Sequence, residues 1–272
     1  MRKSMISLTV LGLLSAPMLT QADEAKKEEK PSYTLAYNVG LFSQYIFRGL
    51  TQTNGDPALQ GGIDWTHDSG FYLGAWGSNI SWLQDSIGEK TSTDSYYKSG
   101  GSLEIDMYGG YRTEIAKTGI TADVGALQYY YPGTRNHDLP KANATELYAA
   151  LSWGWLQGKY SGVVSSDSWG FANSRGTSYI EANLTVPVGD LVKNEYLKGV
   201  SLLAHVARQN FKGNGNDAAD YTDYKVGVTK TFDNGVNVGG YWTGTTTRDV
   251  AWTLEGKNIG ANTGTVFVQK TF

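Results

Sequence analysis

The sequence predicts an all-β fold, a transmembrane antiparallel β-barrel of twelve strands with short periplasmic turns and longer extracellular loops. Apolar and polar residues alternate with a period of two along most of the chain, the connections alternate in length, and aromatic residues gather near the predicted strand ends. The composition agrees with one ordered domain, because 272 residues contain 34 glycines and 18 tyrosines but no cysteine. Disulfide scaffolds, zinc ribbons and thiol enzymes are therefore excluded.

The first residues predict export. Arg2 and Lys3 form a basic start, residues 5–14 are apolar, and residues 20–22 provide a cleavage site, which together are typical of a secretory signal peptide. The apolar run is shorter than the roughly 20 residues that a spanning helix needs. We therefore expect three parts, namely a signal peptide over 1–22, a short charged periplasmic tail over 23–32 and a single barrel domain over 33–272.

The alternation is clearest near residue 105. Leu103, Ile105 and Met107 share one face of a strand, and Glu104 and Asp106 share the other. Strand side chains point to opposite faces in turn, so lipid on one side and water on the other produce this pattern. It predicts strands at 35–49, 57–66, 70–79, 102–112, 119–130, 144–155, 159–167, 177–187, 199–208, 221–232, 236–245 and 261–272.

The connections between these strands differ in length. Most of those after odd-numbered strands are long and polar, whereas those after even-numbered strands are short, which is typical of outer-membrane barrels. The first external loop, after Gly49, is expected to be short, and the connection 188–198 is longer than a periplasmic turn usually is. The short turns are 67–69, 114–118, 156–158 and 233–235, and the long loops are 80–101, 131–143, 168–176, 209–220 and 246–260.

A soluble β-sandwich would alternate as well, and aromatic residues decide between the two folds. An interfacial girdle is expected to contain Tyr33, Trp65, Trp153, Trp155, Tyr160 and Trp242. Phe272 ends a strand that carries Val266 and Val268 on alternate positions, like the terminal aromatic signal of outer-membrane barrels, although Lys270 interrupts that face. The expected partners are outer-membrane lipid and, through this last strand, the barrel assembly machinery.

Several short pieces together resemble one family. They are Ser43, Tyr45, Phe47-Arg48-Gly49, Gln52, 60–62, 69–74, Trp76, 78–79, 104–106, 108–111 and 129–133. These pieces are similar to the TorF-type porin family, also catalogued as Gcw_chp, and they are densest in the first half of the chain. The resemblance implies an outer-membrane protein of about this size with a transport role, and it supplies no catalytic residue.

The search for chemistry is mostly negative. The three histidines, His67, His137 and His205, lie too far apart in sequence to form a metal pair, and His205 occupies a lumen-facing strand position. An enzyme with Asp and His at the external rim, such as Asp167, Asp223 and His137, is an alternative, but any acidic loop offers such a set. We therefore predict no enzyme, catalytic residue, metal or cofactor. A net charge of −3 makes nucleic acid an unexpected partner.

Charged residues on the inward face are the informative group. Glu104, Glu146, Glu181 and Asp223 start descending strands and Asp167 ends an ascending one, so they are expected to surround the external mouth. Arg48, at the external end of the first strand, is expected to pair with these acids. The residues predicted to line the lumen or its rim are Arg48, Glu104, Asp106, Glu146, Asp167, Glu181, Asp223 and Lys225, and parity also turns Asp64, Arg112 and Asp123 inward.

These observations predict an outer-membrane porin or small-solute channel. Acids outnumber bases among the inward charges, and oxygen rings in a pore favour cations, so the lumen is expected to be mildly acidic and cation-preferring. A barrel with a closed lumen, acting as a structural protein or as an adhesin through its external loops, is the alternative. An outer-membrane enzyme comes third. The sequence does not identify the solute.

Overall fold

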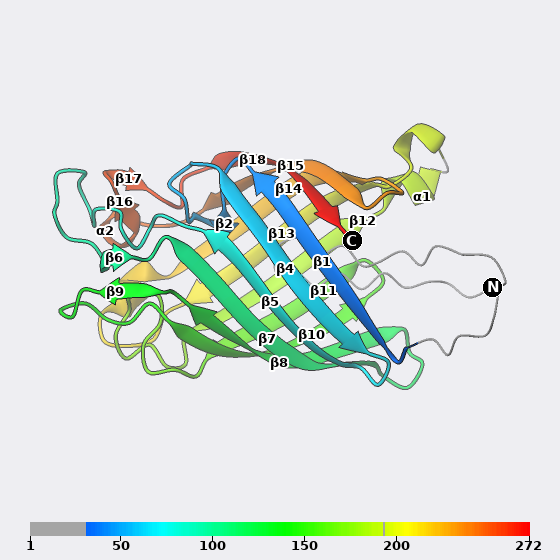
Figure 1. Cartoon of the computed structure of the whole chain (residues 1–272), viewed down its shortest axis with the longest axis horizontal. Coiled ribbons are helices and arrows are strands. Elements are labelled where there is room, and N and C mark those ends of the chain that lie inside the picture. Colours follow the sequence, from blue (N-terminus) through cyan, green and yellow to red (C-terminus); the bar gives the residue numbers. More distant parts are fainter. Residues whose placement is uncertain (1–30, 193) are drawn as a thin grey trace.

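The computed structural model describes residues 31–192 and 194–272 (Figure 1). The expected signal peptide over 1–22 and most of the expected tail over 23–32 lie outside this part of the chain. Among the described residues, no helix has the length and apolar character needed to cross a membrane.

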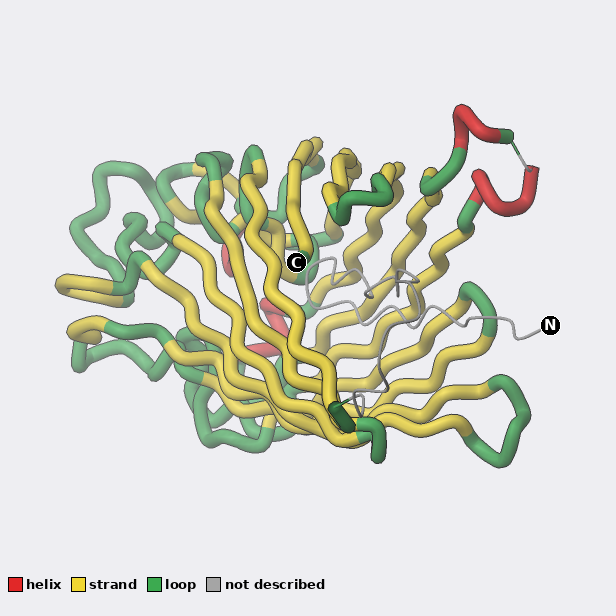
Figure 2. The backbone as a smooth tube through the Cα atoms, turned by 45° about the vertical axis from the view of Figure 1, so that its right-hand side comes forward, coloured by secondary structure: helices red, strands yellow, loops and turns green. Residues whose placement is uncertain are grey.

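Twelve antiparallel strands close into a barrel, which confirms the predicted fold class. Each strand pairs with its neighbours in sequence, and β1 closes the ring against β18, with Gly40 opposite Gln269. Figure 2 shows the strands wrapping around one lumen. The wall consists of β1 (Tyr33–Phe42), β4 (Ala58–His67), β5 (Phe71–Asn79), β7 (Leu103–Glu114), β8 (Ile120–Tyr130), β10 (Ala144–Trp153), β11 (Leu156–Val163), β12 (Ser178–Val186), β13 (Val200–Asn210), β14 (Tyr221–Thr231), β15 (Val236–Thr245) and β18 (Thr263–Thr271).

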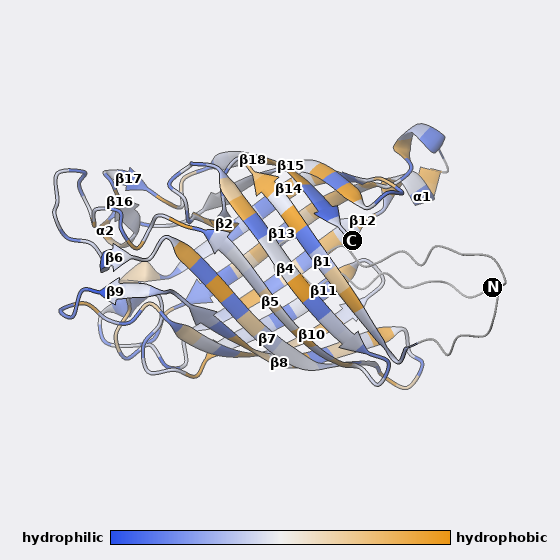
Figure 3. Cartoon of the chain, in the orientation of Figure 1, coloured by the Kyte–Doolittle hydropathy of each residue, from blue (hydrophilic) through white to orange (hydrophobic). Residues whose placement is uncertain are grey.

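The two faces of the wall differ as the period of two predicts. On β7, Leu103 and Met107 point outward and are 40% and 49% exposed, whereas Glu104 and Asp106 point inward and are buried. Figure 3 shows apolar residues alternating with polar ones along the strands. Apolar side chains on the outside and polar ones inside are the reverse of a soluble sandwich and match a barrel in lipid.

The predicted aromatic girdle is only partly present. Tyr33, Trp153 and Trp155 are exposed at the end of the barrel that carries the short turns, as an interfacial belt requires. Tyr160 is also exposed, but it lies in the middle of β11, so it does not belong to a belt at either end.

Short and long connections lie at opposite ends of the barrel, and we call the long-loop end the mouth. The connection 187–199 belongs to the short-turn end and holds helix α1 (Val188–Val192) and the 3-10 turn η1 (Glu195–Leu197). The C-terminus lies at the same end (Figure 1). The other short connections are 68–70, 115–119, 154–155 and 232–235, and the long ones are 43–57, 80–102, 131–143, 164–177, 211–220 and 246–262.

The first external loop is not short, which corrects the sequence-based expectation. β1 ends at Phe42 rather than continuing to 49, and residues 43–57 contain a small hairpin of β2 (Ile46–Phe47) and β3 (Leu50–Thr51). Arg48 and Gly49 form its two-residue turn with positive φ angles of 46° and 81°, the conformation that suits a tight β-hairpin. We call residues 46–51 the inward hairpin.

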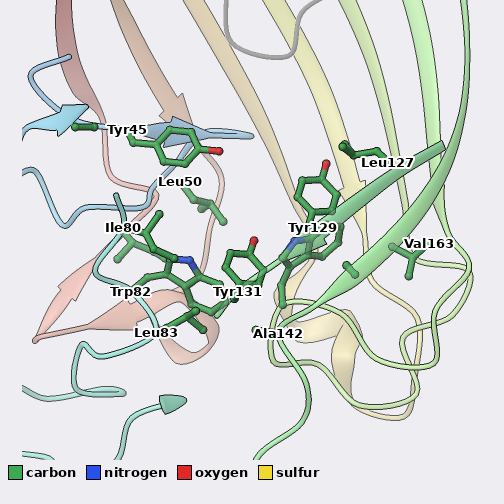
Figure 4. Packing of buried hydrophobic residues seen from close by; sticks show 14 of the residues in the cluster. Tyr45, Leu50, Ile80, Trp82, Leu83, Leu127, Tyr129, Tyr131, Ala142 and Val163 are labelled. Carbon is green, nitrogen blue, oxygen red and sulfur yellow. The ribbon is translucent and has the colours of Figure 1, made fainter. Parts of the chain in front are cut away.

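The long loops pack over the mouth as one cap. They carry β6 (Tyr97–Gly100), β9 (Gly133–Arg135), η2 (Asn216–Ala219), α2 (Asp249–Trp252), β16 (Thr253–Leu254) and β17 (Lys257–Asn258). Trp82 and Tyr131 meet edge-on with ring centroids 5.6 Å apart, and Phe211 lies 5.7 Å from Trp252. Figure 4 shows Trp82, Leu83 and Tyr131 packed together beside Leu50 of the inward hairpin. The described part of the mouth is therefore filled by buried apolar side chains.

Closure of the sheet predicts a simple gel result. A barrel without free strand edges is expected to resist unfolding by detergent, so the unheated protein should migrate differently from the boiled protein. Boiling should move the band to the position of the fully unfolded chain, whose mass is 29.6 kDa before the predicted signal peptide is removed. A single band that heating leaves unchanged, from protein that stays in solution without detergent, would contradict a membrane barrel.

Candidate functional site

Most of the predicted lumen residues lie on the inner wall close to the mouth. The five acids are buried, with exposed fractions of 8% or less, and Lys225 is half-buried. Their neighbours on either side in each strand point outward. The residues are Glu104 and Asp106 on β7, Glu146 on β10, Glu181 on β12, and Asp223 and Lys225 on β14.

Arg48 fastens the inward hairpin to the opposite wall. Its Nη2 lies 2.7 Å from Glu146 Oε2, and its Nη1 donates to Gln209 Oε1 at 3.1 Å. The guanidinium also lies over the ring of Tyr179, 4.2 Å from its centroid, and 5.3 Å from that of Trp169. The side chain is 8% exposed. Arg48 thus pairs with one of the acids expected around the mouth, although it does so from a loop rather than from the first strand.

Gly49, beside Arg48, sets how closely the hairpin approaches the wall. A Cβ at this position would lie 2.6 Å from Asp223 Cβ and 2.6 Å from Thr245 Cγ2, so only glycine fits without a shift. The Tyr221 hydroxyl donates to the backbone oxygen of Arg48 at 2.9 Å. The hairpin strands pair with each other in a separate two-stranded sheet and not with the barrel wall. The hairpin tip is therefore held by side-chain contacts.

Tyr45, just before the hairpin, provides a further attachment. Its hydroxyl donates to Glu104 Oε1 at 3.0 Å. Burial, and after it the charge of Glu104, raises the pKa of this phenol well above its ordinary value. Tyr45 therefore stays protonated at neutral pH and remains a donor to Glu104.

Asp167 does not belong to the charged lumen, contrary to the sequence prediction. β11 ends at Val163, so Asp167 lies in the loop 164–177. Its Oδ1 accepts the backbone N–H of Asn173 at 3.1 Å, and its carbonyl oxygen accepts from Ser165 Oγ. These hydrogen bonds belong to a local turn of the loop. The inward orientation predicted from strand alternation therefore does not apply to the Asp167 carboxylate.

Lys159 and His205 belong to the lumen but were absent from the predicted site. Lys159 is 8% exposed, and its Nζ lies 4.5 Å from the centroid of the Tyr148 ring. His205 lies 2.9 Å from Asp223 Oδ1 through Nε2 and 2.6 Å from Asn183 Oδ1 through Nδ1. The alternation of β11 places Lys159 inward. The sequence-based strand begins at residue 159, whereas β11 begins at Leu156, so Lys159 stood at the edge of the predicted strand.

A second polar layer lies farther from the mouth. Arg112 Nη2 contacts Asp123 Oδ2 at 2.8 Å, and the Tyr72 hydroxyl donates to Asp123 Oδ1 at 2.6 Å. Tyr108 donates to Asp64 in the same part of the lumen. The Arg112 side chain is 29% exposed, so solvent reaches this layer.

The inward hairpin covers a cavity of about 130 Å³ inside the barrel. Residues 45–49 of the hairpin segment form one side of it. The wall contributes the aromatic residues Phe42, Trp76, Tyr129, Tyr179 and Tyr241 and the ionisable residues Asp106, Lys159, Glu181, His205, Asp223 and Lys225. The cavity is therefore both charged and aromatic.

The described residues contain no group of three or more His, Cys, Asp or Glu side chains placed to hold a metal ion. The lumen carboxylates other than Asp106 instead pair with arginine, tyrosine, histidine or amide groups.

Comparison with known proteins gives one family. The model of a family described as "Bacterial protein of unknown function (Gcw_chp)" matches residues 26–272. No curated protein matches this chain in sequence.

Several solved porin structures resemble the chain weakly. The KdgM porin, solved in complex with disordered oligogalacturonate, has 10% identity and a TM-score of 0.48, and the match covers 88% of this chain and 98% of that one. The anion-selective porin from Comamonas acidovorans has 12% identity and a TM-score of 0.39, with 89% and 99% covered. The outer membrane protein OpdK from Pseudomonas aeruginosa has 10% identity and a TM-score of 0.40, and the match covers 90% of this chain and 68% of that one. Likenesses of this size say nothing about which solute this chain carries.

Proposed function

The chain belongs to the Gcw_chp family of bacterial proteins, and from the geometry of its barrel we propose that it is an outer-membrane channel for small solutes, closed at its mouth by the inward hairpin. The TorF name remains a resemblance of sequence pieces. The proposal concerns what the closed barrel and its lumen can do.

The charged cavity beneath the hairpin is the observation that carries the proposal. Asp106, Lys159 and Lys225 are ionisable side chains enclosed by the wall. Removing an ion from water costs several kcal/mol even after the protein relaxes. Ionisable side chains would therefore destabilise a purely structural barrel whose interior is filled with protein. They suit a lumen in which water or a polar solute takes part in solvation.

The hairpin and the loop cap separate this cavity from the outside. The tip is held by the Arg48–Glu146 pair and by hydrogen bonds from Arg48 and Tyr221 side chains. Water can replace contacts of this kind without unfolding a barrel strand. Leu50 also packs into the cap, and the Thr51 N–H donates to the Ile259 carbonyl of the cap. We infer that the hairpin leaves the lumen together with part of the cap while the twelve-stranded wall stays intact.

Charge in the lumen supports a preference for cations. Acids outnumber bases on the inner side of the wall and of the inward hairpin. The acids are Asp64, Glu104, Asp106, Asp123, Glu146, Glu181 and Asp223, and the bases are Arg48, Arg112, Lys159 and Lys225. Carboxylate oxygens lining a narrow pore attract cations and repel anions. We infer that the open channel passes cationic or neutral small solutes more readily than anions.

The aromatic packing of the cap favours a second candidate. The cap joins rings from several loops, with Phe171 and Phe211 only 4.4 Å apart at their centroids, and such packing also suits a permanently closed mouth. In that case the protein would be a structural barrel or an adhesin acting through its external loops.

Planar-bilayer recording separates these candidates. Refolded protein that shows the heat-dependent gel shift is inserted into a neutral bilayer, and current is recorded under a KCl gradient. We expect discrete steps and a reversal potential on the cation-selective side. Correctly folded protein that never conducts would overturn the channel and favour the closed barrel.

A further inference from the structure

Asp106 is a buried carboxylate that the protein leaves without a partner. It is 2% exposed, and its Oδ1 has no hydrogen-bond partner. It lines the cavity beneath the inward hairpin. A buried polar atom normally has a partner, and leaving one unpaired costs about 1–3 kcal/mol, more for a charged group. The orientation of Asp106 into a cavity therefore points to a ligand.

Aromatic residues surround this carboxylate. Trp76 on β5 and Tyr129 on β8 are its partners across the two neighbouring strands, and both line the same cavity. Tyr45 meets Trp76 edge-on, with centroids 5.3 Å apart. Figure 4 shows Tyr45 and Tyr129 projecting into the lumen from two different elements. Trp76 and Tyr129 thus flank Asp106 on its two neighbouring strands, and Tyr45 packs against Trp76 beside them.

The cationic side chains of the lumen contact groups other than Asp106. Arg48 is held by Glu146 and Gln209. Lys225 lies on β14, which is on the opposite side of the twelve-strand ring from β7, and its Nζ lies over the ring of Tyr241. Lys159 lies over Tyr148. None of these cations forms an ion pair with Asp106 in the described structure.

A second carboxylate increases the local negative charge. Glu104, two positions away on the same face of β7, receives the Tyr45 hydroxyl on Oε1 and also lies beside the Tyr131 hydroxyl, and it forms no ion pair with a cation in the described structure. Two neighbouring acids that form no ion pair in the described structure, beside buried aromatic rings, make a site that a positive charge would complete.

We propose that Asp106, Trp76, Tyr129 and Tyr45 form a binding site for the ammonium group of a small organic cation. The site deepens the proposed channel function and rests on it for its role in transport. The carboxylate supplies the counter-charge, and the rings supply cation–π attraction, which is the usual way in which proteins bind quaternary ammonium groups. A bare divalent metal ion fits poorly, because Ca²⁺ and Mg²⁺ prefer several oxygen ligands and the carbon atoms of the aromatic rings are not ligands of this kind.

Isothermal titration of refolded protein in detergent tests the site without requiring conduction. Choline is the probe, and 3,3-dimethylbutan-1-ol, which has the same shape without the charge, is the matched ligand. We expect choline to bind at least tenfold more tightly than the neutral alcohol. Titration with potassium chloride at the same ionic strength should give no comparable heat.

Two variants locate the site. Asp106→Asn keeps the size of the side chain but removes its charge and should weaken choline binding at least tenfold, whereas Trp76→Leu should weaken it by removing a ring. Asp64→Asn is the matched control, because Asp64 is another lumen acid but is bonded to Tyr108 and does not line the cavity. It should leave choline affinity within twofold. All three proteins are first checked for the heat-dependent gel shift.

Equal affinity for choline and the neutral alcohol would overturn the site, as would choline binding that Asp106→Asn leaves unchanged. The second result would show that Asp106 is kept neutral by a bound proton. If the protein binds choline but never conducts, the cation site is supported and the channel function is rejected. If it conducts but does not bind choline, the channel function is supported and the cation site is rejected.

Discussion

Replacing Arg48 by alanine is expected to increase the ratio of open to closed channel by at least about a hundredfold. The change removes the 2.7 Å ion pair with Glu146 and the hydrogen bond to Gln209. Breaking a buried pair by removing one partner costs about 3–5 kcal/mol, and every 1.4 kcal/mol shifts a two-state equilibrium about tenfold. The cost falls on the closed state alone, because the inward hairpin leaves the wall in the open state. Single-channel recording in a planar bilayer measures the effect.

Arg208→Ala is the control for this experiment. Arg208 also lies at the mouth, but it is 44% exposed and its contact with Asp220 is 3.5 Å long, so the pair contributes little. Its removal changes the net charge of the protein by the same amount and should leave the open fraction unchanged. An Arg48→Ala channel that opens no more often than Arg208→Ala would show that the hairpin does not control the mouth.

A charge on the lipid face should destabilise the barrel strongly in the middle of the membrane. Val226 lies at the centre of β14, points outward and is 57% exposed. Val226→Arg is expected to lower the free energy of unfolding by about 2–4 kcal/mol, because the guanidinium would face the hydrocarbon midplane. The neighbouring Lys225 already carries a charge in the lumen, which shows how sharply the two faces differ.

Val236→Arg is the matched control, since the same substitution is made at the short-turn end of the barrel. Val236 is the first residue of β15 and lies opposite Lys270, where a cation can reach the interface. The expected cost there is under about 1 kcal/mol. Denaturant titration in lipid vesicles, followed by tryptophan fluorescence, gives both values. Equal costs at the two depths would mean that the barrel does not span the bilayer as the alternation implies.

The wall of the barrel could be predicted because its two faces meet different solvents. The alternation of Leu103, Glu104, Ile105 and Asp106 follows directly from lipid on one side and a polar lumen on the other. The same parity identifies which charged residues of the regular strands face inward. Alternation also fixes the register, because a slip of one residue would move every charge to the lipid face.

The inward hairpin could not be predicted in the same way. Residues 43–49 continue the alternating pattern of β1, so they read as more of the same strand, yet Tyr45 and Phe47 face protein instead of lipid. The turn itself is hidden, because Arg48 has a positive φ although arginine seldom adopts one. An apolar residue under a loop cap and an apolar residue on the lipid face look alike in a sequence.

Partner choice in the lumen depends on closure of the ring. Arg48 and Glu146 are 98 positions apart in sequence, and only the closed barrel with its inward loop brings them together. Asp106 shows the complementary case, because parity places it in the lumen, while its lack of a partner is visible only when every surrounding strand is in position.

Locking the inward hairpin to the wall tests the central claim most directly. The chain has no cysteine, and a Cβ at position 49 would lie 2.6 Å from the Thr245 methyl, so the double variant Gly49→Cys/Thr245→Cys brings two thiols within reach of a disulfide. The oxidised and the reduced protein carry the same two substitutions, so the reduced protein is the control for the disulfide. We predict that the oxidised protein inserts into a bilayer but stays closed, and that adding a reductant to the same bilayer restores channel openings. Equal conductance before and after reduction, with the disulfide verified by mass spectrometry, would contradict closure by the hairpin.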